Sequence, residues 1–256
     1  MTYRPFFTEG ANRPSRWLVT CDHAANTVPP FVNGGSLGLD PADMARHIAY
    51  DPGAAGVARA LARALGAPCI MTNFSRLVID PNRGEDDPTL VMKLYDGTII
   101  PANRHVGPAD IEQRLNALYR PYHSELARMA ARQDDTIIVS IHSFTRQLQG
   151  RPPRPWHIGV LYATDERLTR PLINRMAQET DICVGENEPY GGHLPGDAIA
   201  RHGIAYQRLN ALIELRNDLI ISEDQQTAWA NRLAPMLIEA AGHAGAELET
   251  VSPQPG

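Results

Sequence analysis

The sequence contains few cysteines, and their pattern argues against a disulfide-stabilised fold. Cys21, Cys69 and Cys183 are odd in number, lie far apart and form no CxxC pair within the 256 residues. Disulfide frameworks have an even number of cysteines at short, regular spacings. We therefore expect three free thiols and a reducing compartment, the cytoplasm.

The sequence also lacks the features of a membrane or nucleic-acid partner. No apolar run approaches the ~20 residues of a membrane helix, and the first ten residues, MTYRPFFTEG, have no apolar signal segment. The formal net charge of -5 comes from acidic residues spread along the chain, whereas phosphate binding needs a basic face. A small-molecule substrate with a carboxylate is compatible with the negative net charge, because a few local arginines can hold the carboxylate.

What is present is typical of a globular α/β enzyme. Hydrophobic residues make up 43% and charged residues 21%, and we expect one domain over residues 1–256 with a disordered tail at 250–256. Apolar runs alternate with segments of helical periodicity, which predicts a mostly parallel, mixed central sheet with helices on both faces. The predicted strands are 17–21, 68–73 with a continuation at 77–79, 136–141, 157–162 and 211–215. One or two helices are predicted over 41–65, and single helices over 110–133, 167–178 and 222–241.

Polar residues follow the predicted strands, where active sites of α/β sheets lie. Asp22 and His23 follow the first strand, and His142 follows the third. Imidazole is the commonest metal ligand, and catalytic zinc takes about three protein groups plus water. Asp51, in HIAYDPG, is the preferred third ligand and Asp22 a weaker one. No HExxH motif occurs, and either histidine could instead be a hydrogen-bonded structural residue.

Two arginines flank a short apolar stretch in SRLVIDPNRG. Arg83 offers a planar fork of donors that matches a carboxylate, and Asn82 beside it can add another donor. Arg76 could polarise a scissile carbonyl as negative charge develops on its oxygen. The alternative is that both arginines form surface ion pairs with nearby acids, namely Asp80, Glu85, Asp86 or Asp87.

A glutamate in the last predicted strand is a candidate general base. Glu214 lies among apolar residues in ALIELRND, so its side chain must point either to solvent or into a cleft. A half-buried carboxylate next to a metal is the usual base for activating water. The alternative is that Arg216, two positions later on the same side of the strand, neutralises it.

The segment 185–193, GENEPYGGH, is too rich in glycine, proline and asparagine for a regular element. As a loop it could bring Tyr190 and His193 over a substrate, or it could be a mere connection. Covalent catalysis has weaker support. Cys21 lies two residues from His23, and we expect no serine nucleophile on a strand-to-helix elbow.

Six blocks of the sequence resemble the N-formylglutamate amidohydrolase family. In order they are CDHAANTVPP, HIAYDPGA, SRLVIDPNRGEDD, IHSF, GENEPYGG and ELRNDLI, and together they cover most of the chain. The resemblance implies a three-layer fold similar to the zinc-dependent exopeptidases, a zinc centre, and hydrolysis of an N-formyl amide to formate and glutamate. It also implies that Asn82 and Arg83 grip a substrate carboxylate, that Arg76 stabilises the oxyanion and that Glu214 is the base.

The same resemblance assigns His23 and His142 as the first and last zinc ligands. The ligand glutamate usual three residues after the first histidine is replaced by Asn26, so Asp51 is the inferred substitute. CDHAAN also departs from the proline- and glycine-rich histidine loop associated with the formylglutamate enzymes, which leaves the acyl group open. The alternatives are a zinc carboxypeptidase, an aspartoacylase-like deacylase, or a non-catalytic binding protein on a degenerate hydrolase fold.

Overall fold

The computed structural model describes residues 3–192 and 195–245, so the predicted tail lies outside the described residues. Its centre is a seven-stranded mixed sheet in the order β1-β3-β2-β6-β9-β7-β8. Four neighbouring strands are parallel to one another: β3 (Cys69–Thr72), β2 (Trp17–Cys21), β6 (Ile137–Phe144) and β9 (Asn210–Arg216). The outer strands are β1 (Phe6–Glu9), antiparallel to β3, then β7 (Ile158–Leu161), antiparallel to β9, and β8 (Val184–Glu186), parallel to β7.

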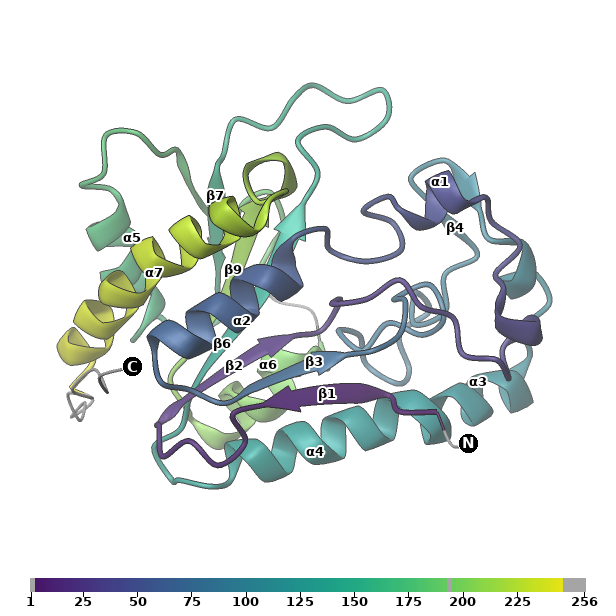
Figure 1. Cartoon of the computed structure of the whole chain (residues 1–256), viewed down its shortest axis with the longest axis horizontal. Coiled ribbons are helices and arrows are strands. Elements are labelled where there is room, and N and C mark those ends of the chain that lie inside the picture. Colours follow the sequence, from purple (N-terminus) through teal and green to yellow (C-terminus); the bar gives the residue numbers. More distant parts are fainter. Residues whose placement is uncertain (1–2, 193–194, 246–256) are drawn as a thin grey trace.

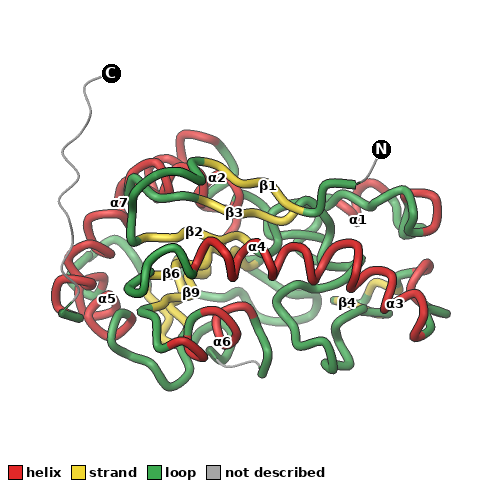
Figure 2. Tube along the Cα trace, turned by 90° about the horizontal axis from the view of Figure 1, so that it is seen from below, coloured by secondary structure: helices red, strands yellow, loops and turns green. Residues whose placement is uncertain are grey.

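Helices cover both faces of this sheet (Figure 1). One face carries α2 (Ala54–Ala64), α5 (Thr169–Met176) and α7 (Glu223–His243), whose start is fixed by a capping box between Ser222 and Gln225. The other face carries α4 (Arg120–Ala130) and α6 (Ala198–His202). One π turn (Leu115–Tyr119) joins α3 (Pro108–Arg114) to α4, so the two form one continuous rod (Figure 2). The predicted α/β architecture is confirmed.

Alternation of side chains along the central strands sorts the apolar residues between the two faces. On β2, Val19 and Cys21 pack in the core beneath α2 and α7, whereas Leu18 packs in the core beneath α4. The same alternation applies to β6 and β9. Because Ile138 and Leu212 lie in the α4 core, the residues of the same parity nearer the carboxyl ends, His142 and Glu214, face that side too.

A separate apolar cluster follows the carboxyl ends of β2 and β3. It includes Val32, Ile48, Phe74 and Leu118. Helix α1 (Pro41–Met44) and the hairpin of β4 (Leu94–Tyr95) and β5 (Thr98–Ile99) pack against it. The predicted continuation of a strand at 77–79 is wrong. These residues form a turn that is fully buried in this cluster, so their apolar character reflects burial outside the sheet.

Other element boundaries also differ from the predictions. Of the one or two helices predicted over 41–65, two form, separated by a loop that carries Asp51, and β6 continues through His142 and Ser143. Residues 185–186, predicted as loop, belong to β8, while β1 and α6 were not predicted. Within the described residues, no helix combines the length and the apolar character needed to cross a bilayer.

Candidate metal centre and active site

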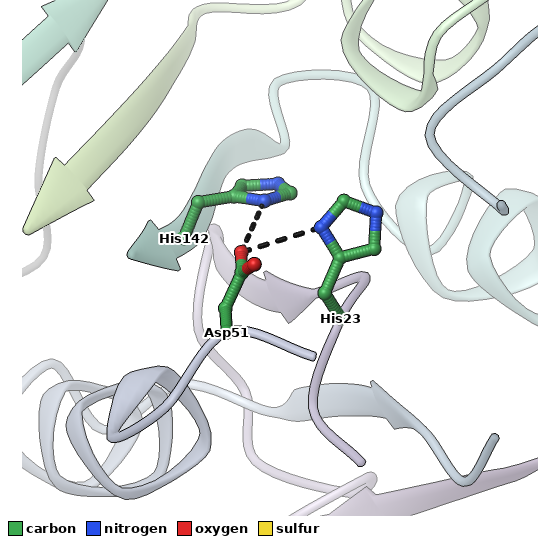
Figure 3. Close-up of side chains that lie close together, drawn as sticks. All are labelled: His23, Asp51 and His142. Carbon is green, nitrogen blue, oxygen red and sulfur yellow. Dashed lines mark hydrogen bonds and ion pairs between the residues drawn. The ribbon is translucent and has the colours of Figure 1, made fainter. Parts of the chain in front are cut away.

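Three of the predicted site residues meet at the carboxyl ends of the central strands (Figure 3). His23 follows β2, Asp51 precedes α2, and His142 lies near the end of β6. Nδ1 of His142 is 2.9 Å and Nδ1 of His23 is 3.3 Å from Oδ2 of Asp51. All three side chains are buried, and one potential ligand atom from each lies within 4.8 Å of the others.

Each histidine turns its other ring nitrogen toward a second buried carboxylate. Nε2 of His23 is 2.7 Å from Oδ1 of Asp80, and Nε2 of His142 is 3.3 Å from Oδ2 of Asp22. Both ring nitrogens of each histidine therefore face carboxylates, and with a cation at the two Nδ1 atoms each Nε2 would carry the proton that it donates to its own carboxylate. Asp22, the weaker candidate ligand, therefore supports His142 instead, and the hydroxyl of Tyr122 donates to its other oxygen.

The charge balance of this group fits a divalent cation. Asp22, Asp51, Asp80 and Glu214 are all buried around the two histidines, against the permanent positive charges of Arg76 and, at 4.0 Å from Asp80, of Arg83. Burial acts to raise the pKa of Asp51, but the charges of His23 and His142 and their hydrogen bonds hold it well below its ordinary value. Two imidazoles and a carboxylate form a frequent catalytic zinc set, and tetrahedral zinc places ligand atoms about 3.3 Å apart. The separations at Asp51 are close to that value.

A cavity of about 460 Å³ opens beside the histidines. Every predicted site residue that the structure describes lines it: His23, Asp51, Arg76, Asn82, Arg83, His142, Tyr190 and Glu214. His193 lies outside the described residues. Leu161, Leu212 and Tyr95 add apolar surface, and His47 adds a further imidazole. The structure therefore brings together residues that lie far apart in the chain, with 191 positions between His23 and Glu214.

Glu214 lies in the adjacent strand beside His142 and is 7% exposed. Its Oε2 is buried and has no hydrogen-bond partner among the described residues. Burial raises the pKa of Glu214 to about 7, against the charge of His142, which lowers it. Arg216, the predicted neutralising partner, donates instead to Asp218 at 2.7 Å. A buried carboxylate that can exchange a proton near neutral pH thus faces the cavity.

The two arginines occupy different places. Arg76 reaches the group of His23, Asp51 and His142, since its guanidinium is 2.9 Å from Oδ2 of Asp80 and 3.4 Å from Oδ1 of Asp51. The expected ion pair with Asp80 therefore exists, but it is buried inside the site and not on the surface. Arg83 donates through Nε to Thr89 at 3.1 Å and through a terminal nitrogen to the carbonyl of Asn82 at 2.8 Å.

The loop after β8 packs directly on the backbone of β7. A Cβ at Gly159 would lie 2.0 Å from the carbonyl oxygen of Glu188, and one at Gly192 would lie 2.0 Å from that of Tyr162. This close approach needs glycine at both positions and places Tyr190 at the cavity. Arg154 donates to the Tyr190 hydroxyl at 3.2 Å and lies over its ring.

The family model for N-formylglutamate amidohydrolase matches residues 15–221. The chain belongs to this family. It is therefore an amide-bond hydrolase, as the six sequence blocks predicted. No curated protein sequence matches the chain significantly.

Solved structures support the same fold. Gene product Atu2144 of Agrobacterium tumefaciens is 32% identical, with a TM-score of 0.89 over 95% of this chain and 97% of that one. The N-formylglutamate amidohydrolase of Ralstonia eutropha JMP134 is 21% identical, with a TM-score of 0.66 over 94% of this chain and 97% of that one. A bacteriophage poly-γ-glutamate hydrolase is 10% identical, with a TM-score of 0.50 over 94% and 92% of the two chains.

A covalent mechanism through Cys21 finds no support in the geometry of this family member. Cys21 is 0% exposed and packs in the core beneath α2, on the opposite side of β2 from the cavity. Burial raises the pKa of its thiol well above the ordinary value. The motif GxSxG occurs at residues 34–38. Ser36 there is exposed beside a short 3-10 turn (Asn33–Gly35), not on a strand-to-helix elbow.

The close packing of the Tyr190 loop makes Gly159 a sensitive position. Gly159→Ala should displace the loop, because the new Cβ overlaps the Glu188 carbonyl. We expect a loss of about 1–3 kcal/mol in the free energy of unfolding and a lower kcat/KM. Gly191→Ala, where nothing lies within 4 Å of the added carbon, is the matched control. Thermal unfolding and steady-state kinetics measure both, and equal behaviour of the two variants would contradict the packing argument.

Proposed function

We propose that this protein hydrolyses N-formyl-L-glutamate, or a closely related N-acyl amino acid, to a carboxylic acid and the free amino acid. The reaction requires a divalent cation, zinc in the first place, which Nδ1 of His23, a carboxylate oxygen of Asp51 and Nδ1 of His142 would hold. The observation that carries the proposal is this buried ligand set beside a cavity lined both by arginines and by Glu214, whose Oε2 has no hydrogen-bond partner within residues 3–192 and 195–245. When bound, the cation supplies Lewis-acid chemistry, lowering the pKa of a water and polarising a carbonyl.

We further propose that the whole chain, residues 1–256, is one amidohydrolase domain that acts in the cytoplasm. The three free cysteines agree with a reducing compartment.

Glu214 is the general base in this mechanism. It accepts a proton from the attacking water as the C–O bond forms, and it returns that proton to the amide nitrogen as the C–N bond breaks. The products are formate and glutamate, so atoms and charge balance. Its buried Oε2, which no described residue hydrogen-bonds, supports this role, because a carboxylate already bound to an arginine would be a weak base.

Arg76 stabilises the negative charge that develops on the carbonyl oxygen. Its guanidinium lies against Asp51 and lines the cavity, and its buried Nε lacks a hydrogen-bond partner in the part of the chain that the structure describes. A fixed positive charge in a water-poor site is worth more than in solution. Arg76 also keeps Asp80 ionised, which in turn orients His23.

Asn82 and Arg83 hold a substrate carboxylate, and Tyr190 covers the bound molecule. Both of the first two residues line the cavity, and Asn82 is 6% exposed. The amide oxygen of Asn82 accepts from the backbone of Ala198 at 3.1 Å, which leaves its amide hydrogens as donors. A role for His193 over the substrate stays a prediction.

Replacing Arg83 tests the carboxylate grip. Arg83→Met should raise KM about 10- to 100-fold with little change in kcat, because charge-assisted hydrogen bonds to the ground state and the transition state are lost alike. N-formylbutylamine, which has no carboxylate, should be hydrolysed equally by both proteins. A KM that rises for this analogue as well would show that Arg83 acts otherwise.

A substrate panel tests the proposed activity. Formate release from N-formyl-L-glutamate is compared with hydrolysis of N-acetyl-L-aspartate, N-succinyl-L-glutamate and a glutamate-terminated dipeptide, each with and without added zinc. We expect the highest kcat/KM for the formyl compound. A preference for the dipeptide would establish a carboxypeptidase, and a preference for a longer acyl group an aspartoacylase-like deacylase.

A further inference from the structure

Helix α6 is connected to three successive residues of the carboxylate-gripping segment, Pro81, Asn82 and Arg83. The first connection is direct, because the backbone N–H of Ala198 donates to Oδ1 of Asn82 at 3.1 Å. This bond fixes which way the Asn82 amide points, since its oxygen is used and its NH₂ group is left to donate elsewhere. The other two connections pass through buried side chains of the rod formed by α3 and α4.

The second connection runs through Tyr119. Its hydroxyl donates to the carbonyl oxygen of Arg83 at 2.5 Å and accepts from the guanidinium of Arg201. The same guanidinium lies 5.2 Å from the centre of the Tyr119 ring, which is fully buried. Arg201 thus places the hydroxyl, and the hydroxyl places the Arg83 backbone.

The third connection runs through two buried histidines. Nε2 of His123 is 3.0 Å from the carbonyl oxygen of Pro81, and Nδ1 of His123 is 2.9 Å from Nε2 of His202. Burial and the neighbouring histidine lower the pKa of His123 to about 3, and burial with Arg201 lowers that of His202 to about 4, so both rings are neutral. A carbonyl only accepts, so His123 carries its proton on Nε2 and accepts at Nδ1 from His202.

We infer that four residues outside the cavity are positioning residues for recognition of the substrate carboxylate, because their hydrogen bonds hold the segment Pro81–Arg83 in place. They are Tyr119, His123, Arg201 and His202. We call these four residues the α6 clamp. None of them lines the cavity, so each acts only through the segment it holds. The inference rests on the proposed function for its kinetic consequence, since Asn82 and Arg83 are there assigned to the substrate. The mechanical part of the inference does not depend on that assignment.

Kinetic tests separate positioning from general stability. Tyr119→Phe removes one hydroxyl and should raise KM for N-formyl-L-glutamate about five- to tenfold, with kcat within about twofold of the wild-type value. In the Arg83→Met background the same change should have almost no further effect, because the group that it positions is gone. Tyr206→Phe, at a tyrosine that is 62% exposed, is the matched control. A multiplicative effect in the double variant would overturn the inference.

Histidine replacements test the third connection. His202→Leu should raise KM by a similar factor, while His202→Gln, which keeps an N–H donor near the place of Nε2, should recover most of the loss. His243→Leu, at an exposed histidine, is the control. Equal kinetics for the leucine and glutamine variants would contradict a hydrogen-bond role.

Hydrogen–deuterium exchange gives a readout that needs no substrate. In His202→Leu and Tyr119→Phe, peptides covering residues 80–90 should exchange faster than in wild type, while peptides from α2 should not change. Unchanged exchange at 80–90 would overturn the inference. If wild-type protein fails to hydrolyse N-formyl-L-glutamate, the proposed function fails, and the exchange comparison still decides whether the α6 clamp holds this segment.

Discussion

Glu214→Gln should lower kcat for formate release about 10³-fold while leaving the metal content of the protein unchanged. Glutamine has the shape of glutamate but cannot accept a proton. The loss should be nearly the whole contribution of the base, because Glu214 is the buried carboxylate that faces the cavity without a hydrogen-bond partner among the described residues. Substrate binding should change little. Steady-state kinetics together with elemental analysis of the variant measure both quantities.

The control for this variant is Glu223→Gln, an exposed position in the first turn of α7. It should have wild-type kinetics. A Glu214→Gln protein that keeps kcat within about tenfold of wild type would remove Glu214 from the proton transfer. A variant that instead loses its metal would assign Glu214 to the ligand set.

Asp51→Ala should abolish both metal binding and activity, with a loss of more than about 10³-fold in kcat/KM. Asp51 contacts the Nδ1 atoms of both His23 and His142, so its removal eliminates the carboxylate ligand and leaves two imidazoles. Elemental analysis after gel filtration and the rate of formate release measure the two losses.

Asp22→Asn is the informative comparison, because Asp22 was the rival candidate for the third ligand. It contacts His142 through Nε2, on the far side of the ring from Asp51. Loss of such a supporting carboxylate costs about 10- to 100-fold in metal affinity, so this variant should still bind metal at saturating concentrations. If Asp22→Asn lost the metal and Asp51→Ala kept it, the roles assigned to Asp22 and Asp51 would be exchanged.

The sequence predicted those parts of the site that follow from the geometry of parallel strands. Strands whose apolar runs are buried on both faces were predicted well: β2 has its predicted bounds, and β9 is one residue longer at each end than predicted. Since parallel strands end at one edge of a sheet, His23 and His142 were expected to meet, and they do. Glu214 followed from its place within a strand, whose register sets it beside His142.

Other parts depend on contacts between distant segments and have no local pattern. The apolar residues 77–79 are as hydrophobic as a strand, but they are buried in a cluster that only the folded chain creates. Asp80 was considered only as a surface partner for the arginines, whereas it supports His23 from a fully buried position. Helix α6 is five residues long, too short for a periodic signal, and its connections to Pro81–Arg83 pass through residues about 80 positions away.

A zinc titration of metal-free protein tests the central claim most directly. Protein stripped with a chelator should have no measurable formate release, and activity should return in proportion to added zinc until one ion is bound per chain. His23→Ala and His142→Ala proteins should not recover under the same conditions. Full activity in protein shown by elemental analysis to contain no metal would contradict the account.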